Sequence, residues 1–209
     1  MMRFFGPVAV AVAMLGVAPF ARAQVILYGV SLSGPAESPS NASPGIGSGG
    51  VDYNPTAHTM RVHFSFSGLT GTTTASHIHA ATATPGTGTA GVATTTPTFA
   101  GFPLGVTSGT YDNTLDMTLS SSYNPSYVTA NGGTTTTAEA ALAAAMAAGE
   151  AYLNVHSTTF GGGEIRGFLT PVPEPGSLAL TGLAVLTALK YSRRRRLAAG
   201  SPPPLTRPV

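Results

Sequence analysis

The stretch that decides the fold is HTMRVHFSFSGLTG, His58 to Gly71. Its apolar side chains alternate with polar ones, so that two sets point in opposite directions: Met60, Val62, Phe64 and Phe66 against Arg61, His63, Ser65 and Ser67. A period of two residues is typical of a half-buried β-strand. Gly68 and Gly71 then mark a turn. The stretch therefore predicts a strand that turns one face to a core.

Further segments predict strands by the same criteria. They are VILYGVSLS from Val25, SGGVDYN from Ser48, TYDNTLDMTLS from Thr110, AYLNVHS from Ala151 and EIRGFLT from Glu164. In the third of these segments the apolar face is expected to comprise Tyr111, Leu115, Met117 and Leu119. Residues 81–103, rich in Thr, Gly and Pro, are expected to form a long loop. The pattern favours an all-β protein, an antiparallel β-sandwich.

One short α-helix interrupts the strands. In TTAEAALAAAMAAGE, Thr136 and Glu139 have the spacing of a capping box, and Gly149 stands where a left-handed C-terminal cap is expected. Alanine, the strongest helix former, fills the segment between them.

The N-terminal 24 residues have the pattern of a secretory signal peptide. A positive charge at Arg3 precedes an apolar run from Phe4 to about Ala18, and the small-x-small pattern Ala21-Arg22-Ala23 precedes a cleavage point between Ala23 and Gln24. The run is shorter than the roughly 20 apolar residues that span a bilayer. We therefore expect a signal helix within residues 1–23 that is removed on export through the Sec translocon.

The C-terminal region has three parts in order. The motif Pro173-Glu174-Pro175 is followed by a hydrophobic helical segment, Leu178 to Leu189, and then by the basic residues Lys190 and Arg193 to Arg196. Under the positive-inside rule such a basic block stays in the cytoplasm. This three-part pattern, residues 172–196, resembles the PEP-CTERM sorting signal of Gram-negative bacteria.

That resemblance implies transient membrane insertion of the segment and recognition near Pro173-Glu174-Pro175 by an exosortase, a membrane protease-transpeptidase. The protein would then reach the cell surface, envelope or extracellular matrix, where exopolysaccharide or envelope proteins are the expected partners. In the family the basic cluster lies close to the end of the chain. Here a proline-rich piece, residues 197–209, follows it, and its composition predicts disorder.

The remaining domain, residues 24–171, is acidic. Between Val25 and Thr170 there are two basic residues, Arg61 and Arg166, against seven acidic ones, which makes the net charge near −5. A nucleic-acid partner needs a dense basic surface and is not expected. The chain has no cysteine, which excludes disulfides, thiolate nucleophiles and cysteine-based zinc sites.

The order of motifs in this domain resembles that of a CHRD domain, the module named after chordin. The resemblance rests on five stretches: LSGPAESPS, FSFSGLTG, SHIHA, the helix and AYLNVHSTTFGGGEIRGFL. It covers Leu32 to Leu169 and implies an antiparallel, immunoglobulin-like, Greek-key β-sandwich without a defined biochemical role.

Two histidines in SHIHA are the leading candidates for a functional site. His77 and His79 share one face of a strand, while Ile78 points to the core. Two imidazoles at this spacing can bind one ion, and a third would complete three protein ligands for zinc. His156 is the first candidate for this third ligand and His63 the second. The His-x-His spacing also resembles that of copper-zinc superoxide dismutases, so that zinc and copper are both considered.

A hairpin between AYLNVHS and EIRGFL, closed by residues 157–163, predicts the neighbours of His156. Its register pairs Asn154 with Arg166, Val155 with Ile165 and His156 with Glu164. The apolar pair then faces the core, and His156, Glu164, Asn154 and Arg166 share the polar face. On this face Glu164 and Arg166 are expected to form an ion pair.

Two functions from different classes remain open. One is an exported binding or structural module that acts through its surface, with histidines that only hydrogen-bond to their neighbours. The other is a metal-binding protein, redox-active if the metal is copper, that uses His77, His79 and His156. The sequence has no nucleophile elbow, phosphate-binding loop or H-E-x-x-H motif, which disfavours an enzyme.

Overall fold

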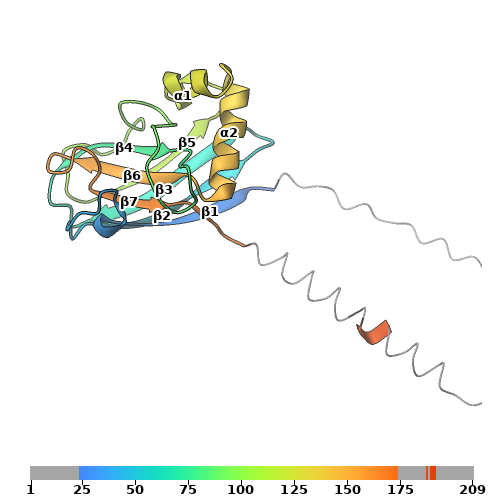
Figure 1. Cartoon of the computed structure of the whole chain (residues 1–209), viewed down its shortest axis with the longest axis horizontal. Coiled ribbons are helices and arrows are strands. Elements are labelled where there is room, and N and C mark those ends of the chain that lie inside the picture. The colour runs from blue at the N-terminus through green and yellow to red at the C-terminus, as the bar shows by residue number, and fades with distance from the viewer. Residues whose placement is uncertain (1–23, 174–186, 188, 192–209) are drawn as a thin grey trace, which may run out of the picture.

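The structure is a computed structural model that describes residues 24–173, 187 and 189–191 (Figure 1). Eight strands occur in the described part of the chain: β1 Ile26–Ser33, β2 Ile46–Asn54, β3 Thr59–Ser67, β4 Thr73–His79, β5 Gly109–Asp116, β6 Tyr152–Ser157, β7 Ile165–Phe168 and β8 Thr170–Pro171. The helices described with them are α1 Pro125–Ala130, α2 Thr135–Ala148 and two 3₁₀ turns, η1 Gly34–Ala36 and η2 Ser120–Ser122.

The strands form one antiparallel sheet in the order β4-β6-β7-β1-β2-β3-β5, and β8 pairs with β1. The all-β antiparallel fold is therefore confirmed. The sheet curls into a half-barrel, so that the layers expected of a sandwich are joined by continuous hydrogen bonding. Residues 99–107 connect its two edge strands: the Phe99 amide donates to the Ser76 carbonyl of β4, and the Tyr111 hydroxyl of β5 donates to the Ala100 carbonyl.

The concave face of the curl holds the core. All four apolar residues predicted for β3 are buried, whereas Arg61, Ser65 and Ser67 are exposed. Phe102 stacks on Phe64 with ring centroids 6.0 Å apart. Burial of this apolar surface, together with Leu142 and Met146 of α2, supplies the main driving force for folding.

Helix α2 differs from its prediction at its start. The capping box is formed by Thr134 and Thr137, two residues before the expected pair. Glu139 is buried instead and accepts a hydrogen bond of 2.9 Å from the Tyr53 hydroxyl. At the other end Gly149 adopts φ +72°, as predicted. The sequence analysis missed α1, which begins with proline after an Asn124 cap.

The prediction for Leu119 is wrong. Strand β5 ends at Asp116, whose carboxylate accepts hydrogen bonds from the Thr118 amide and hydroxyl. The chain then enters the 3₁₀ turn η2, and Leu119 is 52% exposed. A local side-chain bond to the backbone has ended the strand before its apolar pattern ends.

Strand β6 is buried on both faces, and this positions the candidate site. Leu153 and Val155 point into the core, while Tyr152, Asn154 and His156 lie on the opposite face. That second face is covered by the segments around Ala36, around Gly88 to Pro97 and around Gly161, whose carbonyls accept hydrogen bonds from side chains of β4, β6 and β7. Polar side chains are thereby enclosed without being part of the apolar core.

The predicted signal helix and most of the predicted hydrophobic helix at the C-terminus lie outside the described residues. Of the latter segment, residues 187 and 189–191 are described and are helical. Within the described part of the chain, no helix has the length and apolar character needed to cross a membrane. Pro173 is described and exposed, whereas Glu174 and Pro175 are not described.

Candidate metal centre

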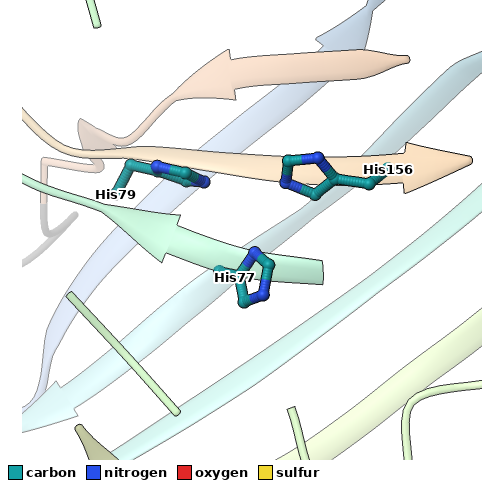
Figure 2. A group of neighbouring side chains, drawn as sticks. All are labelled: His77, His79 and His156. Atoms are coloured by element: carbon teal, nitrogen blue, oxygen red, sulfur yellow. The ribbon is translucent and has the colours of Figure 1, made fainter. Parts of the chain in front are cut away.

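The structure brings His77, His79 and His156 together (Figure 2). One nitrogen from each ring lies within 4.8 Å of the corresponding nitrogen of the others. The ring centroids are 5.1 Å apart for His77 and His156, 5.7 Å for His77 and His79, and 5.9 Å for His79 and His156. His156, the first candidate for the third ligand in the sequence analysis, is therefore the histidine that completes the cluster.

Strand pairing explains this convergence. In the antiparallel pair β4–β6, His77 lies opposite Asn154, His79 opposite Tyr152, and His156 opposite Ala75. His156 is thus the diagonal neighbour of His77 on the same face. The small side chain of Ala75 leaves room for the imidazole to lean toward the other two.

Each imidazole is oriented by a backbone carbonyl. His77 Nε2 is 2.5 Å from the Pro97 oxygen, His79 Nδ1 is 2.9 Å from the Ala90 oxygen, and His156 Nδ1 is 3.0 Å from the Gly161 oxygen. A carbonyl can only accept, so these three nitrogens carry the protons. In a neutral imidazole the other nitrogen then holds a lone pair.

The three lone-pair nitrogens are the ones that have no partner. His77 Nδ1, His79 Nε2 and His156 Nε2 are buried and make no hydrogen bond. The side chains that carry them are only 6%, 8% and 9% exposed. An unsatisfied buried acceptor costs about 1–3 kcal/mol. A single ion that accepts lone pairs could satisfy all three of these nitrogens.

The surroundings keep the imidazoles neutral. Burial lowers the pKa of His79 to about 4, although its hydrogen bond to Ala90 acts in the opposite direction. Burial also lowers the pKa of His77 and of His156 below the ordinary value of a histidine. At neutral pH all three rings are therefore in the form that binds a metal.

The polar neighbours of the cluster follow the predicted register in part. Asn154 pairs with Arg166 and Val155 with Ile165, as expected. The Arg166 guanidinium donates to the carbonyls of Ala36 and Gly88 at 2.5 and 2.9 Å. It thereby fastens two covering segments to the sheet face that carries the histidines.

Glu164 departs from the prediction. Its carboxylate accepts hydrogen bonds from the Ser43 hydroxyl at 2.6 Å and from the Thr70 and Gly71 amides. Burial raises the pKa of Glu164, but hydrogen bonding to the Ser157 side chain, together with these three hydrogen bonds, outweighs it and holds the pKa below its usual value. Gly163, with φ +134°, interrupts the alternation before β7 begins. The carboxylate therefore accepts hydrogen bonds from the turn after β3 and pairs with neither His156 nor Arg166.

The remaining histidines are not part of the cluster. His63, the second choice for a third ligand, has its Nε2 3.3 Å from Asp52 Oδ1 on the outer face of β3. His58 lies in a turn, with φ +51° and its Nδ1 2.8 Å from Glu139 Oε2.

Sequence reasoning missed two contributors, Tyr152 and Glu37. The Tyr152 ring stacks on His79 at 4.8 Å with an interplanar angle of 4°, and the Arg166 guanidinium lies 4.7 Å from its centroid. The two-residue period of β6 could have identified it, since Tyr152 shares a face with His156. Glu37 Oε2 is 3.8 Å from Arg166 Nε across 129 positions of chain, and only the fold reveals that pair.

The geometry of the cluster is compatible with one transition-metal ion. Nitrogens bound to one zinc at about 2.05 Å with tetrahedral angles are about 3.4 Å apart. Side-chain shifts of roughly 1 Å would bring the three nitrogens from their present separation to this one. In the described residues no fourth histidine or carboxylate joins the group. Three protein ligands with one open position form a set that zinc and copper both accept.

Comparisons with known proteins identify the domain. A search of curated proteins and a search of solved structures each returned no match. A protein-family model described as the CHRD domain matches residues 28–169, which contain the three histidines and every strand from β1 to β7 apart from the first residues of β1. The chain thus belongs to the CHRD domain family.

Proposed function

We propose that this CHRD domain is a metal-binding module whose centre is formed by His77, His79 and His156. One observation carries the proposal: three buried imidazole nitrogens without hydrogen-bond partners converge, while the opposite nitrogen of each ring is bonded to a backbone carbonyl. Donation from the second ring nitrogen is the usual way in which a protein fixes the tautomer of a metal-binding histidine.

A purely structural role accounts less well for this arrangement. Histidines that serve as hydrogen-bonding residues satisfy both nitrogens, because a buried polar atom without a partner destabilises the fold. Here the three ring nitrogens without a partner belong to imidazoles that lie side by side (Figure 2). Since the pKa values of all three rings are lowered, a proton does not fill the gap at neutral pH.

The proposed place of action is outside the inner membrane. The signal-peptide pattern of residues 1–23 and the sorting motif Pro173-Glu174-Pro175 support export by the Sec translocon, processing by an exosortase and delivery to the envelope or extracellular matrix. Mass spectrometry of the secreted protein tests this: a mature chain that begins at Gln24 is expected. Unchanged processing after replacement of Pro173 and Pro175 by alanine would count against the sorting step.

The metal proposal is tested on the purified protein without an added histidine tag. After loading with zinc or copper and removal of free metal, elemental analysis is expected to find about one equivalent per chain, the stoichiometry of a single three-ligand site. The His63→Ala variant, which leaves the cluster intact, is expected to behave identically. Less than about 0.1 equivalent of either metal would overturn the proposal, since such a site then has no meaningful occupancy.

A further inference from the structure

We infer that the three-histidine centre selects a monovalent ion, copper(I), over divalent zinc. This inference rests on the proposed metal-binding function and goes beyond it by naming the metal and its oxidation state. Four observations support it: the charge of the donors, the partners of the donors, the positive charge of Arg166 and the number of donors in the enclosed site.

The donors bring no negative charge to the ion. The group contains three imidazoles, and the described residues supply no carboxylate to it. The chain has no cysteine. A divalent ion would keep its full double charge in a buried place. The free energy needed to move an ion out of water rises with the square of its charge, so a double charge costs about four times as much as a single one.

The second nitrogen of each ring also faces a neutral group. Its acceptor is the carbonyl of Pro97, Ala90 or Gly161 in the three cases. Zinc sites often use a carboxylate in this place, which makes the imidazole a more basic ligand and offsets part of the charge of the ion. No such compensation is provided for any of the three rings.

A fixed positive charge lies close to the cluster. Arg166, Tyr152 and His79 form a stack, with 4.7 Å from the guanidinium to the Tyr152 centroid and 4.8 Å from that centroid to the His79 ring. The Arg166 guanidinium is thus separated from a ligand of the cluster by a single aromatic ring.

Glu37, 3.8 Å from Arg166, offsets that charge only in part. Burial raises the pKa of Glu37 to about 7 against the opposing influence of Arg166. The other nearby carboxylate, Glu164, is directed to Ser43, Thr70 and Gly71. A field of this sign disfavours a divalent ion more than a monovalent one.

Coordination number points the same way. Zinc in proteins is almost always four-coordinate and would need a water or another exogenous ligand here. Copper(I), a d¹⁰ ion without a ligand-field preference, accepts three nitrogens in a trigonal arrangement as a complete set. The cluster offers three nitrogens in side chains that are at most 9% exposed.

The direct test is an anaerobic competition experiment on the metal-free protein. Copper(I) is titrated against bicinchoninate, and zinc is titrated separately against a chromogenic zinc chelator. The dissociation constant for copper(I) is expected to be at least about 100-fold smaller than that for zinc. Equal or tighter zinc binding would overturn this inference and leave the proposed function standing. If neither ion binds, both fail.

A matched pair of variants isolates the charge argument. Ala75 lies opposite His156 on the face of the cluster. Ala75→Asp adds a negative charge there, and Ala75→Asn adds nearly the same volume without a charge. The aspartate variant is expected to bind zinc at least about tenfold more tightly relative to copper(I) than the asparagine variant does. Equal ratios in two variants with native melting temperatures would overturn the charge argument, and if either variant does not fold, the wild-type competition decides.

Discussion

Two histidines, His58 and His63, lie beside carboxylates, whereas His77, His79 and His156 are enclosed against backbone carbonyls. His58 contacts Glu139 with half of its side chain exposed, and His63 contacts Asp52 with a third exposed. In the enclosed group all three pKa values are lowered by burial, and each ring keeps one nitrogen without a partner. The same residue type thus serves as a polar contact in one region and as a potential ligand in the other.

The difference shows what makes a histidine available to a metal. A ring that lies beside a carboxylate and is open to solvent can satisfy both nitrogens, one with the carboxylate and the other with water. A carbonyl beside a buried ring fixes one tautomer and leaves a lone pair in a place from which water is nearly excluded. Burial and the identity of the second partner, rather than the number of histidines, therefore distinguish the two regions.

The largest expected effect comes from removing a ligand. His156→Ala should weaken metal binding by at least about 100-fold, because two imidazoles with an open pocket remain. His63→Ala should change the affinity by less than about twofold, since surface substitutions away from a site have little effect. Titration of metal into each metal-free variant measures both. Equal losses of metal affinity in the two variants would show that the enclosed and the carboxylate-paired histidines do not differ in metal binding.

Acid should lower the stability of the metal-free protein through its enclosed histidines. The unfolded chain protonates His79 near pH 6.5, whereas the folded pKa is about 4. Stability from this group is thus present above pH 6.5 and is lost as pH falls toward 4, by up to about 3 kcal/mol. His77 and His156, whose pKa values are also lowered, act in the same direction.

Glu37 acts in the opposite direction over the same range. Its folded pKa is about 7 and its ordinary value 4.5, so stability from its protonated form is present below 4.5 and is lost as pH rises toward 7. Urea unfolding of Glu37→Gln from pH 7 to pH 4 should therefore show a steeper loss of stability in acid than the wild type. Parallel curves for the two proteins would contradict the opposed contributions.

A smaller effect is expected at the carboxylate-paired region. Tyr53→Phe removes the 2.9 Å hydrogen bond to the buried Glu139 carboxylate. The free energy of unfolding should fall by about 1–2 kcal/mol, as for a hydrogen bond to a charged group. His58→Ala, at the half-exposed side of the same carboxylate, should cost less than about 1 kcal/mol. Urea denaturation of both variants measures the two losses of stability. A larger loss in His58→Ala than in Tyr53→Phe would contradict this prediction.

The smallest expected change is that of metal affinity with pH. Three ordinary imidazoles would lose several hundred-fold in affinity between pH 7 and pH 5.5, since each becomes about 90% protonated. Rings whose pKa values are lowered by burial become protonated at lower pH than ordinary imidazoles do. The affinity should therefore fall by much less than this over the same range. A fall of several hundred-fold in competition titrations would show that the cluster titrates like exposed histidines.

Several parts of the fold could be predicted because they depend on local pattern. The alternation in β3 depends only on successive side chains pointing to opposite faces, and all four predicted core residues are buried. The β6–β7 register followed from the requirement that Val155 and Ile165 share the core. The convergence of His77, His79 and His156 followed in turn, since the three were placed on polar strand faces.

Other parts failed where a local contact overrode the pattern. Leu119 continues the apolar alternation, but Asp116 bonds to the Thr118 backbone and ends the strand. Glu164 lies two residues before Arg166 and was therefore expected on the same strand face. Instead, Gly163 turns the backbone, and the Glu164 carboxylate accepts a hydrogen bond from the Ser43 hydroxyl. The start of α2 was displaced because Thr134, rather than Thr136, found the matching partner three residues on.

By itself the sequence determined the all-β class, the strand faces and the three histidines, because side-chain direction along a strand repeats every two residues. Only the tertiary structure decided which imidazole nitrogens carry protons and which remain free, because the oxygens of Pro97, Ala90 and Gly161 come from loops whose positions no strand pattern encodes. It also decided that Arg166 lies over the Tyr152 ring that stacks on His79, while Glu37 approaches Arg166 and Glu164 bonds to Ser43. The environment of the three histidines is thus a property of how the loops close over the sheet.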